Sequence, residues 1–190
     1  QKTAYEIMPS LVGSEMCIRD RAKNILLMYA NKMKNNFISA IGAFVCIFIL
    51  ATLNSYYEGN FWLIPPFGAS MVLVMAVHES PLAHPKNILF GHILSALSGV
   101  IVFAVFGISS LSIALAVGLA VFTMMLTKTV HPPAGANPII AVMGAKGLSF
   151  VLMPVAAGAS FIILFAIIYN KLLKRKYFTF KDLKHVSDIE

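Results

Sequence analysis

Two short segments of the chain combine residue types that can bind a small ion. Each reads Pro-Pro-x-Gly-Ala, at 65–69 and at 132–136, and each is followed by a side chain that forms hydrogen bonds, Ser70 or Asn137. Two prolines cannot continue a helix but are well suited to starting one. We therefore expect short helices to begin here after unwound chain. The unpaired N–H groups at such a helix start attract an anion.

The two segments together predict one substrate site. Gly68 and Gly135 would let a backbone or a ligand approach closely because they have no side chain. His131 could contact the anion, take up a proton that travels with it, or only cap the turn through a backbone hydrogen bond, and these roles stay open. A second interpretation, that both segments are only kinks or packing turns, also stays open. The predicted substrate-binding residues are Pro66, Gly68, Ala69, Ser70, His131, Pro133, Gly135, Ala136 and Asn137.

Four histidines and a glutamate raise a different possibility, the metal site of an enzyme. These residues are His78, Glu79, His84, His92 and His131. Their spacings match none of the helical pairings that present two ligands on one face, such as His-x-x-x-His. The sequence also shows no serine–histidine or cysteine–histidine pairing and no phosphate-binding loop. We therefore expect no enzyme, no cofactor and no metal, and a histidine-based intramembrane metalloenzyme is the least favoured alternative. Glu79 is expected to pair with Lys86 or a histidine at the membrane surface.

The composition indicates that these residues lie in a membrane protein. Of 190 residues, 58% are hydrophobic and 12% are charged, with a mean hydropathy of +0.81. A soluble domain has about 25% charged residues. The net charge of +7 comes mostly from the two ends of the chain, so we expect no nucleic-acid partner.

Long apolar blocks predict an all-α, polytopic bundle with about six membrane-embedded segments. Two of these segments are helices broken by the Pro-Pro pairs, and a tight turn at Gly107 separates two others. The blocks are 37–53, 61–77, 88–106, 108–126, 132–143 and 148–169. Small residues recur every four positions in three of them, which favours close helix packing in lipid. These sets are Gly91, Ser95 and Gly99; Ala114 and Gly118; and Ala156 and Ser160.

The chain also resembles itself at an offset of 67 residues. The two Pro-Pro-x-Gly-Ala segments then coincide, as do Gly91 and Gly158. This weak symmetry predicts repeats at about 37–106 and 108–170, as in many transporters. The repeats are inverted if the Pro-Pro segments cross the membrane and parallel if they are re-entrant.

Positive charge predicts the orientation. Lys and Arg gather in 19–34 and 171–184, so both termini are expected to be cytoplasmic in a multi-pass protein of the cell inner (plasma) membrane. Six crossings would also place Lys86 and Lys128 on the cytoplasmic side, which favours inverted repeats.

The first 21 residues stand apart. The stretch 11–21 resembles translated sequencing-adapter sequence, so we expect residues 1–21 to be non-native or disordered and the native protein to begin near Ala22. Residues 22–176 are then the membrane domain, and 177–190 a short cytoplasmic tail.

Three ordered motifs carry a family resemblance over about 36–169. The stretch 129–137, Thr-Val-His-Pro-Pro-Ala-Gly-Ala-Asn, resembles the signature of the HPP family of integral membrane proteins. The stretches 62–70 and 81–87, the latter followed by Gly-His at His92, are similar to other recurrent parts of that family. The resemblance implies a membrane protein, and characterised plant-plastid and cyanobacterial members are similar to nitrite transporters.

The expected function is therefore membrane transport of a small inorganic anion, nitrite first among them. The expected partners are this anion, the lipid bilayer and further copies of the chain, because fewer than 200 residues enclose a path with difficulty. A membrane sensor or scaffold that binds the anion without moving it is the main alternative.

Overall fold

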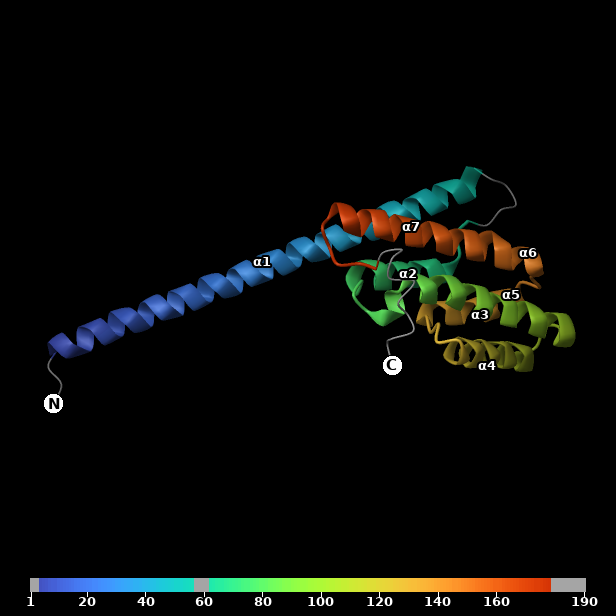
Figure 1. Ribbon diagram of the computed structural model, residues 1–190, viewed down its shortest axis with the longest axis horizontal. Helices are drawn as coiled ribbons and strands as arrows, with labels where there is room; N and C mark the ends of the chain where they lie inside the picture. The colour runs from blue at the N-terminus through green and yellow to red at the C-terminus, as the bar shows by residue number, and fades with distance from the viewer. Residues whose placement is uncertain (1–3, 57–61, 179–190) are drawn as a thin grey trace. The chain divides into compact units, whose positions relative to one another are not determined.

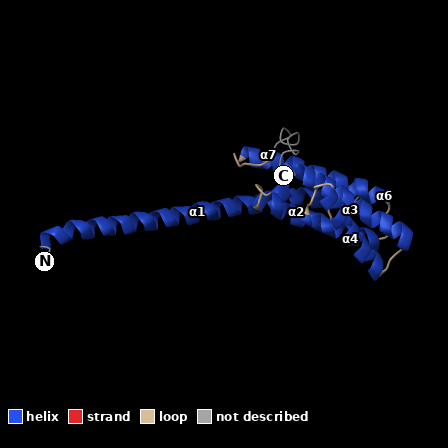
Figure 2. Ribbon diagram, turned by 60° about the horizontal axis from the view of Figure 1, so that its bottom comes forward, coloured by secondary structure: helices blue, strands red, loops and turns tan. Residues whose placement is uncertain are grey.

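The computed structural model describes the backbone of residues 4–56 and 62–178, with side chains from Asp20 onward. Within these ranges every regular element is helical (Figure 2). The chain divides into two units, 1–40 and 41–190. The backbone of the first unit is helical from Ala4 onward. That residues 1–21 are not native stays a prediction.

Helix α1, Ala4–Tyr56, contains the first predicted block. In the second unit it turns one face inward, on which Gly42, Cys46 and Leu50 are buried at intervals of four residues. This spacing is that of one helix face. The stretch between the first two predicted blocks, 54–60, is helical as far as Tyr56, and the rest of it lies outside the described residues.

The other elements follow the predicted blocks closely. They are α2 (Pro65–Ala76), η1 (Pro81–Ala83), α3 (Pro85–Phe106), α4 (Ser110–Leu126), η2 (Pro132–Ala136), α5 (Asn137–Met143), α6 (Leu148–Phe150), η3 (Val151–Ala156) and α7 (Ala157–Leu172). In the described chain three stretches are long and apolar enough to cross a membrane: 20–56, 85–106 and 148–172. Helices α2 and α4 are apolar but shorter.

Both Pro-Pro pairs start helices, as the sequence predicts. Helix α2 begins at Pro65, directly after Ile64 in extended conformation. In the second half, extended His131 leads into the 3₁₀ turn η2, and the α-helix proper begins only with α5. Pro138 lies in the first turn of α5 and has no N–H to donate to the carbonyl of Ala134, so an α-helical ladder cannot run through η2.

The last predicted span is interrupted, which the sequence interpretation missed. A short π-helical segment, η3, lies between α6 and α7 and contains Pro154. Met153 has extended angles (φ −136°, ψ 118°), the conformation that a following proline favours. By contrast, the predicted turn at Gly107 is confirmed, with φ at +67° closing α3.

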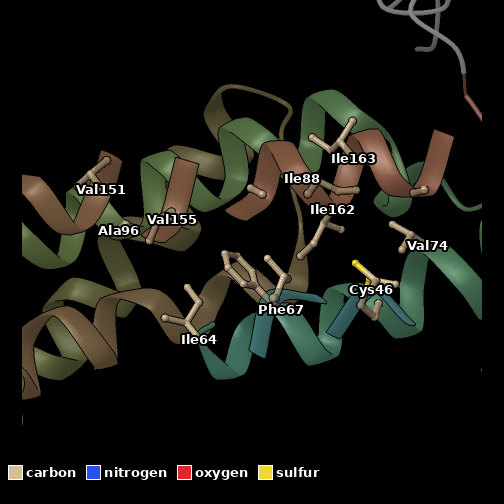
Figure 3. Close-up of a cluster of buried hydrophobic side chains, with 14 of the residues drawn as sticks. Cys46, Ile64, Phe67, Val74, Ile88, Ala96, Val151, Val155, Ile162 and Ile163 are labelled. Carbon is tan, nitrogen blue, oxygen red and sulfur yellow. The ribbon is translucent and has the colours of Figure 1, made fainter. Parts of the chain in front are cut away.

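Helix α3 is the centre of the second unit. It packs against α4, α5, η2 and α7, and both ribbon views place it between α7 and α4 (Figures 1 and 2). The main apolar core lies beside it, where Phe67 of α2 is surrounded by residues of α1, α2 and α7 (Figure 3). Fully buried members of this core include Cys46, Leu50, Phe67, Met71, Ile88, Val155 and Ile162.

The small residues of α3 allow the second Pro-Pro segment to lie directly on the helix. A Cβ added at Gly99 would lie 2.7 Å from the Cα of Pro138, and one at Gly91 would lie 2.8 Å from the Cβ of His131. Close packing is therefore confirmed for this set. The other two sets do not pack in this way within the chain: a Cβ at Gly118 meets no atom within 4 Å, and Ser160 is exposed.

The close contact between α3 and the second Pro-Pro segment predicts opposite effects of two glycine substitutions on the stability of the protein. Gly99→Ala places a methyl group against backbone, so we expect it to lower the free energy of unfolding by about 1–3 kcal/mol. Gly118→Ala is matched, because it also lies inside a helix but faces open space; there alanine should stabilise by up to about 1 kcal/mol. Thermal unfolding midpoints in detergent measure both. Equal midpoints for the two variants would contradict the close contact at Gly99.

Candidate functional site

Five polar side chains are fully buried where α2, α3, η2 and α5 meet. They are Ser70, His92, Ser95, His131 and Asn137, each 0% exposed. Polar side chains buried among apolar helices are costly unless they are hydrogen-bonded, and in membrane proteins they mark functional sites by default. The sequence predicted Ser70, His131 and Asn137 as substrate-binding residues; it raised His92 only as a possible metal ligand and Ser95 only as a small packing residue. We call these five residues the polar cluster.

Ser70 is the hub of the polar cluster. Its Oγ lies 2.9 Å from Nε2 of His92 and 2.9 Å from Nε2 of His131. It also lies 3.2 Å from the carbonyl oxygen of Pro66, one turn earlier in α2. The expectation that the chain holds no serine–histidine pairing is therefore wrong. The two histidines are 22 and 61 positions away, so only the tertiary fold brings them to the hydroxyl.

The position of one hydrogen follows from the partner of His131. Its Nδ1 lies 2.9 Å from the carbonyl oxygen of Leu82 in η1. A carbonyl only accepts, so Nδ1 carries a hydrogen and donates it. In the neutral ring Nε2 then has a free lone pair, which accepts the hydroxyl hydrogen of Ser70. The ring of His131 thus does not cap the turn that follows it, which was one of its predicted roles.

The contacts of Asn137 show in the same way which nitrogen of His92 carries the hydrogen. Its Nδ2 lies 3.1 Å from the carbonyl oxygen of His92, 2.9 Å from the Oγ of Ser95 and 2.9 Å from Nδ1 of His92. Contact with a carbonyl identifies this atom as the amide nitrogen, so Nδ1 of His92 accepts and Nε2 carries the hydrogen. Nε2–H then donates to Ser70. The hydrogen bonds therefore form one chain in which each group donates to the next: Asn137 to His92, His92 to Ser70, Ser70 to His131, and His131 to the carbonyl oxygen of Leu82.

One acceptor of the polar cluster has no partner in the described structure. This atom is Oδ1 of Asn137, which is buried. An unsatisfied buried acceptor costs about 1–3 kcal/mol, so a ligand or water that donates a hydrogen would be bound favourably here. On another side, the ring of Phe67 covers His92 edge to face, with centroids 5.4 Å apart. The donors of the cluster already have acceptors inside the protein, so the group that remains for a ligand is this one free acceptor in an apolar setting.

The remaining predicted residues lie less deeply. Pro66 is buried, and its carbonyl is the one that Ser70 approaches. Five others are exposed or partly exposed: Gly68, Ala69, Pro133, Gly135 and Ala136. A Cβ at Gly68 or Gly135 would meet no atom within 4 Å, so no other part of the described chain packs against either glycine. Their contact with a substrate stays a prediction.

The other histidines have separate positions. His84 is the N-cap of α3, and its Nδ1 accepts from the backbone N–H of Lys86 at 3.1 Å. His78 contacts the carbonyl oxygen of Lys176 at 2.7 Å and lines a surface hollow of about 450 Å³ together with Glu79. Among the described residues, no group of three or more His, Cys, Asp or Glu side chains is placed to hold a metal ion.

The segment after α7 contacts the turn η1 and the residue that follows it, and so supports the site indirectly. Tyr177 donates its hydroxyl hydrogen to the carbonyl oxygen of Ala83 at 3.0 Å, and the rings of His84 and Phe178 lie 4.5 Å apart. Burial raises the pKa of the Tyr177 hydroxyl, so it remains a donor at neutral pH. These contacts hold the turn η1, whose Leu82 carbonyl orients His131.

The directed hydrogen bonds predict the tautomers of the two buried imidazoles. In ¹⁵N-histidine NMR spectra of the protein at neutral pH, His131 should carry its hydrogen on Nδ1 and His92 on Nε2. The variants His131→Gln and His92→Gln assign the two signals. Finding the hydrogen of His131 on Nε2 would contradict the bond to Leu82.

Known proteins match most of the chain. A model of the HPP family, transmembrane region, matches residues 28–178. A transmembrane protein of Dictyostelium discoideum is 37% identical over 151 residues, which cover 73% of this chain and 49% of the relative. A second from the same organism is 35% identical over 122 residues, covering 60% and 43%. The chain thus spans about half the length of the curated relatives it matches, and no solved structure matches it.

The range matched by the family model includes the whole polar cluster. All five of its residues lie inside the matched range, as do the three apolar stretches 85–106, 148–172 and most of 20–56. With most of its length matched by the family model, this chain belongs to the HPP family of transmembrane proteins.

Proposed function

We propose that the chain transports a small inorganic anion across the membrane, with nitrite as its substrate. The observation that carries this proposal is the position of His92. Its imidazole is fully buried in an apolar helix, and the two residues that follow the Pro-Pro segments hold its two nitrogens: Ser70 holds Nε2, and Asn137 holds Nδ1. Ionisable residues beside broken helices are typical of substrate pathways in transporters.

The same contacts support two repeats with six membrane-embedded segments, and the positions of Lys86 and Lys128 favour the inverted arrangement. Ser70 and Asn137 are equivalent under the offset of 67, and they hold opposite sides of one ring. Gly91 and Gly158 are also equivalent. Gly91 lies against the second half of the chain at His131, and Gly158 lies against the ring of Phe67 in the first half. Each half therefore provides a small residue where the other half approaches.

The lengths of the broken helices agree with a site inside the membrane. Helix α2 has 12 residues. This gives about 18 Å, less than the ~30 Å of a hydrocarbon core. We place the change from extended chain at Ile64 to helix within the membrane. Pro65 and Pro66 have no N–H, and the N–H of Phe67 donates to the carbonyl oxygen of Ile64 at 3.0 Å, so the anion site proposed here depends on the side chains of the polar cluster and not on free N–H groups of the helix start. Nitrite is the substrate that the resemblance to nitrite transporters implies.

The placement of the protein in the cell is part of the proposal. The basic ends of the chain support cytoplasmic termini in the inner (plasma) membrane. Helix α4 presents a largely exposed apolar surface, which lipid or further copies of the chain would cover in a homo-oligomer.

Ser70→Ala tests the site. The substitution leaves Nε2 of both histidines without its partner, so we expect saturable nitrite uptake into proteoliposomes to fall about tenfold or more. Ser98→Ala is the matched control: Ser98 is also buried, but its hydroxyl bonds only the carbonyl four residues back, at 2.8 Å. Its uptake should stay near that of the unmodified protein.

Empty liposomes provide the baseline, and alkaline buffer keeps the nitrite ionised. Thermal unfolding of each variant shows that it is folded. Equal uptake by both serine variants would remove Ser70 from the site. Nitrite binding without uptake above empty liposomes would contradict transport and favour the sensor.

A further inference from the structure

The hydroxyl of Ser70 has one hydrogen and two acceptors within reach. They are Nε2 of His131 at 2.9 Å and the carbonyl oxygen of Pro66 at 3.2 Å. While His131 is neutral, the hydrogen points to its Nε2. When a proton adds to Nε2, the ring donates to Oγ instead, and the hydroxyl hydrogen turns to Pro66. His131 therefore keeps both hydrogen bonds in both protonation states.

No negative side chain in the described structure is placed to balance a charge on His131. Between residues 21 and 181 the acids are Glu58 and Glu79. Glu79 is exposed, and Glu58 lies outside the described residues. Helix α2 itself contains no titratable residue. The titratable groups on, or next to the ends of, the elements packed around His131 are His78, Glu79, His84, Lys86, His92, Lys128 and Lys146, and the one acid among them in the described structure, Glu79, is exposed.

An imidazolium in this setting would be an unpaired buried charge, which costs several kcal/mol. A bound anion removes that cost. Proton and anion therefore bind more tightly together than either binds alone. This mutual dependence is the thermodynamic basis of coupling between two sites.

We infer that His131 takes up one proton with each substrate anion, so that the protein is an electroneutral proton–anion symporter. The inference rests on the proposed function and adds its coupling ion. The proton adds to the lone pair of Nε2 on one side of the membrane and leaves from the same atom on the other. One anion and one proton cross in each cycle, and no net charge moves.

The test measures nitrite uptake and internal pH in the same proteoliposomes, with the membrane potential clamped by valinomycin and potassium. Uptake above empty liposomes should rise several-fold with an acid-outside gradient at zero potential. It should not change when the potential changes, and one proton should enter with each nitrite.

Variants locate the coupling. His131→Gln keeps an amide donor and acceptor but cannot be protonated, so its remaining uptake should ignore the pH gradient and respond to potential. His78→Gln, at the surface hollow, should keep the coupling of the unmodified protein. If His131→Gln does not fold, Ser70→Ala and Ser70→Thr serve instead. In Ser70→Ala, which lacks the hydroxyl, nitrite uptake should no longer depend on the pH gradient. In Ser70→Thr, which keeps a hydroxyl, this dependence should be present.

The possible failures are distinct. Saturable uptake that follows the potential and ignores the pH gradient would overturn symport and leave anion transport standing. Coupling that persists in His131→Gln would overturn the assignment to His131. No saturable uptake by folded protein would overturn the proposed function, and this inference with it.

Discussion

The interior depends on a single constraint: the hydroxyl of Ser70 is buried among apolar helices and must be hydrogen-bonded there. Its bonds join α2 to α3 through His92 and to η2 through His131. These bonds need the second Pro-Pro segment to lie directly against α3, and the lack of a side chain at Gly91 and Gly99 permits this. Small residues, broken helices and polar side chains are thus parts of one arrangement.

Much of the fold follows from local features and was therefore predictable. Long apolar runs gave the helices, and prolines gave the starts of α2 and η2, because a missing N–H acts on the nearest turn of the chain. Pro154 acts equally locally, yet its effect was missed because the apolar run continues on both sides of it. The number of membrane crossings depends on the orientation of short segments in lipid, which composition does not determine.

The candidate site was predictable only in part, for a related reason. Ser70, His131 and Asn137 stand next to recognisable Pro-Pro motifs. His92 lies inside an uninterrupted apolar helix with partners 22 and 45 positions away, so its sequence neighbours give no sign of its role. The available signal was its position beside the small-residue series: His92 follows Gly91 and stands three residues before Ser95, and that face of α3 had to meet another segment. The glycines also differ from one another: Gly68 and Gly135 of the motifs have no neighbouring atom within 4 Å of an added Cβ, whereas Gly91 and Gly99 of α3 receive close contacts, as predicted.

The separation of these partners along the chain affects how the protein is made. Ser70 is synthesised early, but His131 is added 61 residues later, and Leu82, which orients it, is also made before it. Helix α2 therefore cannot complete its polar contacts until the second half of the chain has been made. Until then its hydroxyl can bond the carbonyl of Pro66, a temporary partner within its own helix. A ribosome that stops between the halves would leave a fragment with its polar groups only partly satisfied, a natural substrate for membrane quality control.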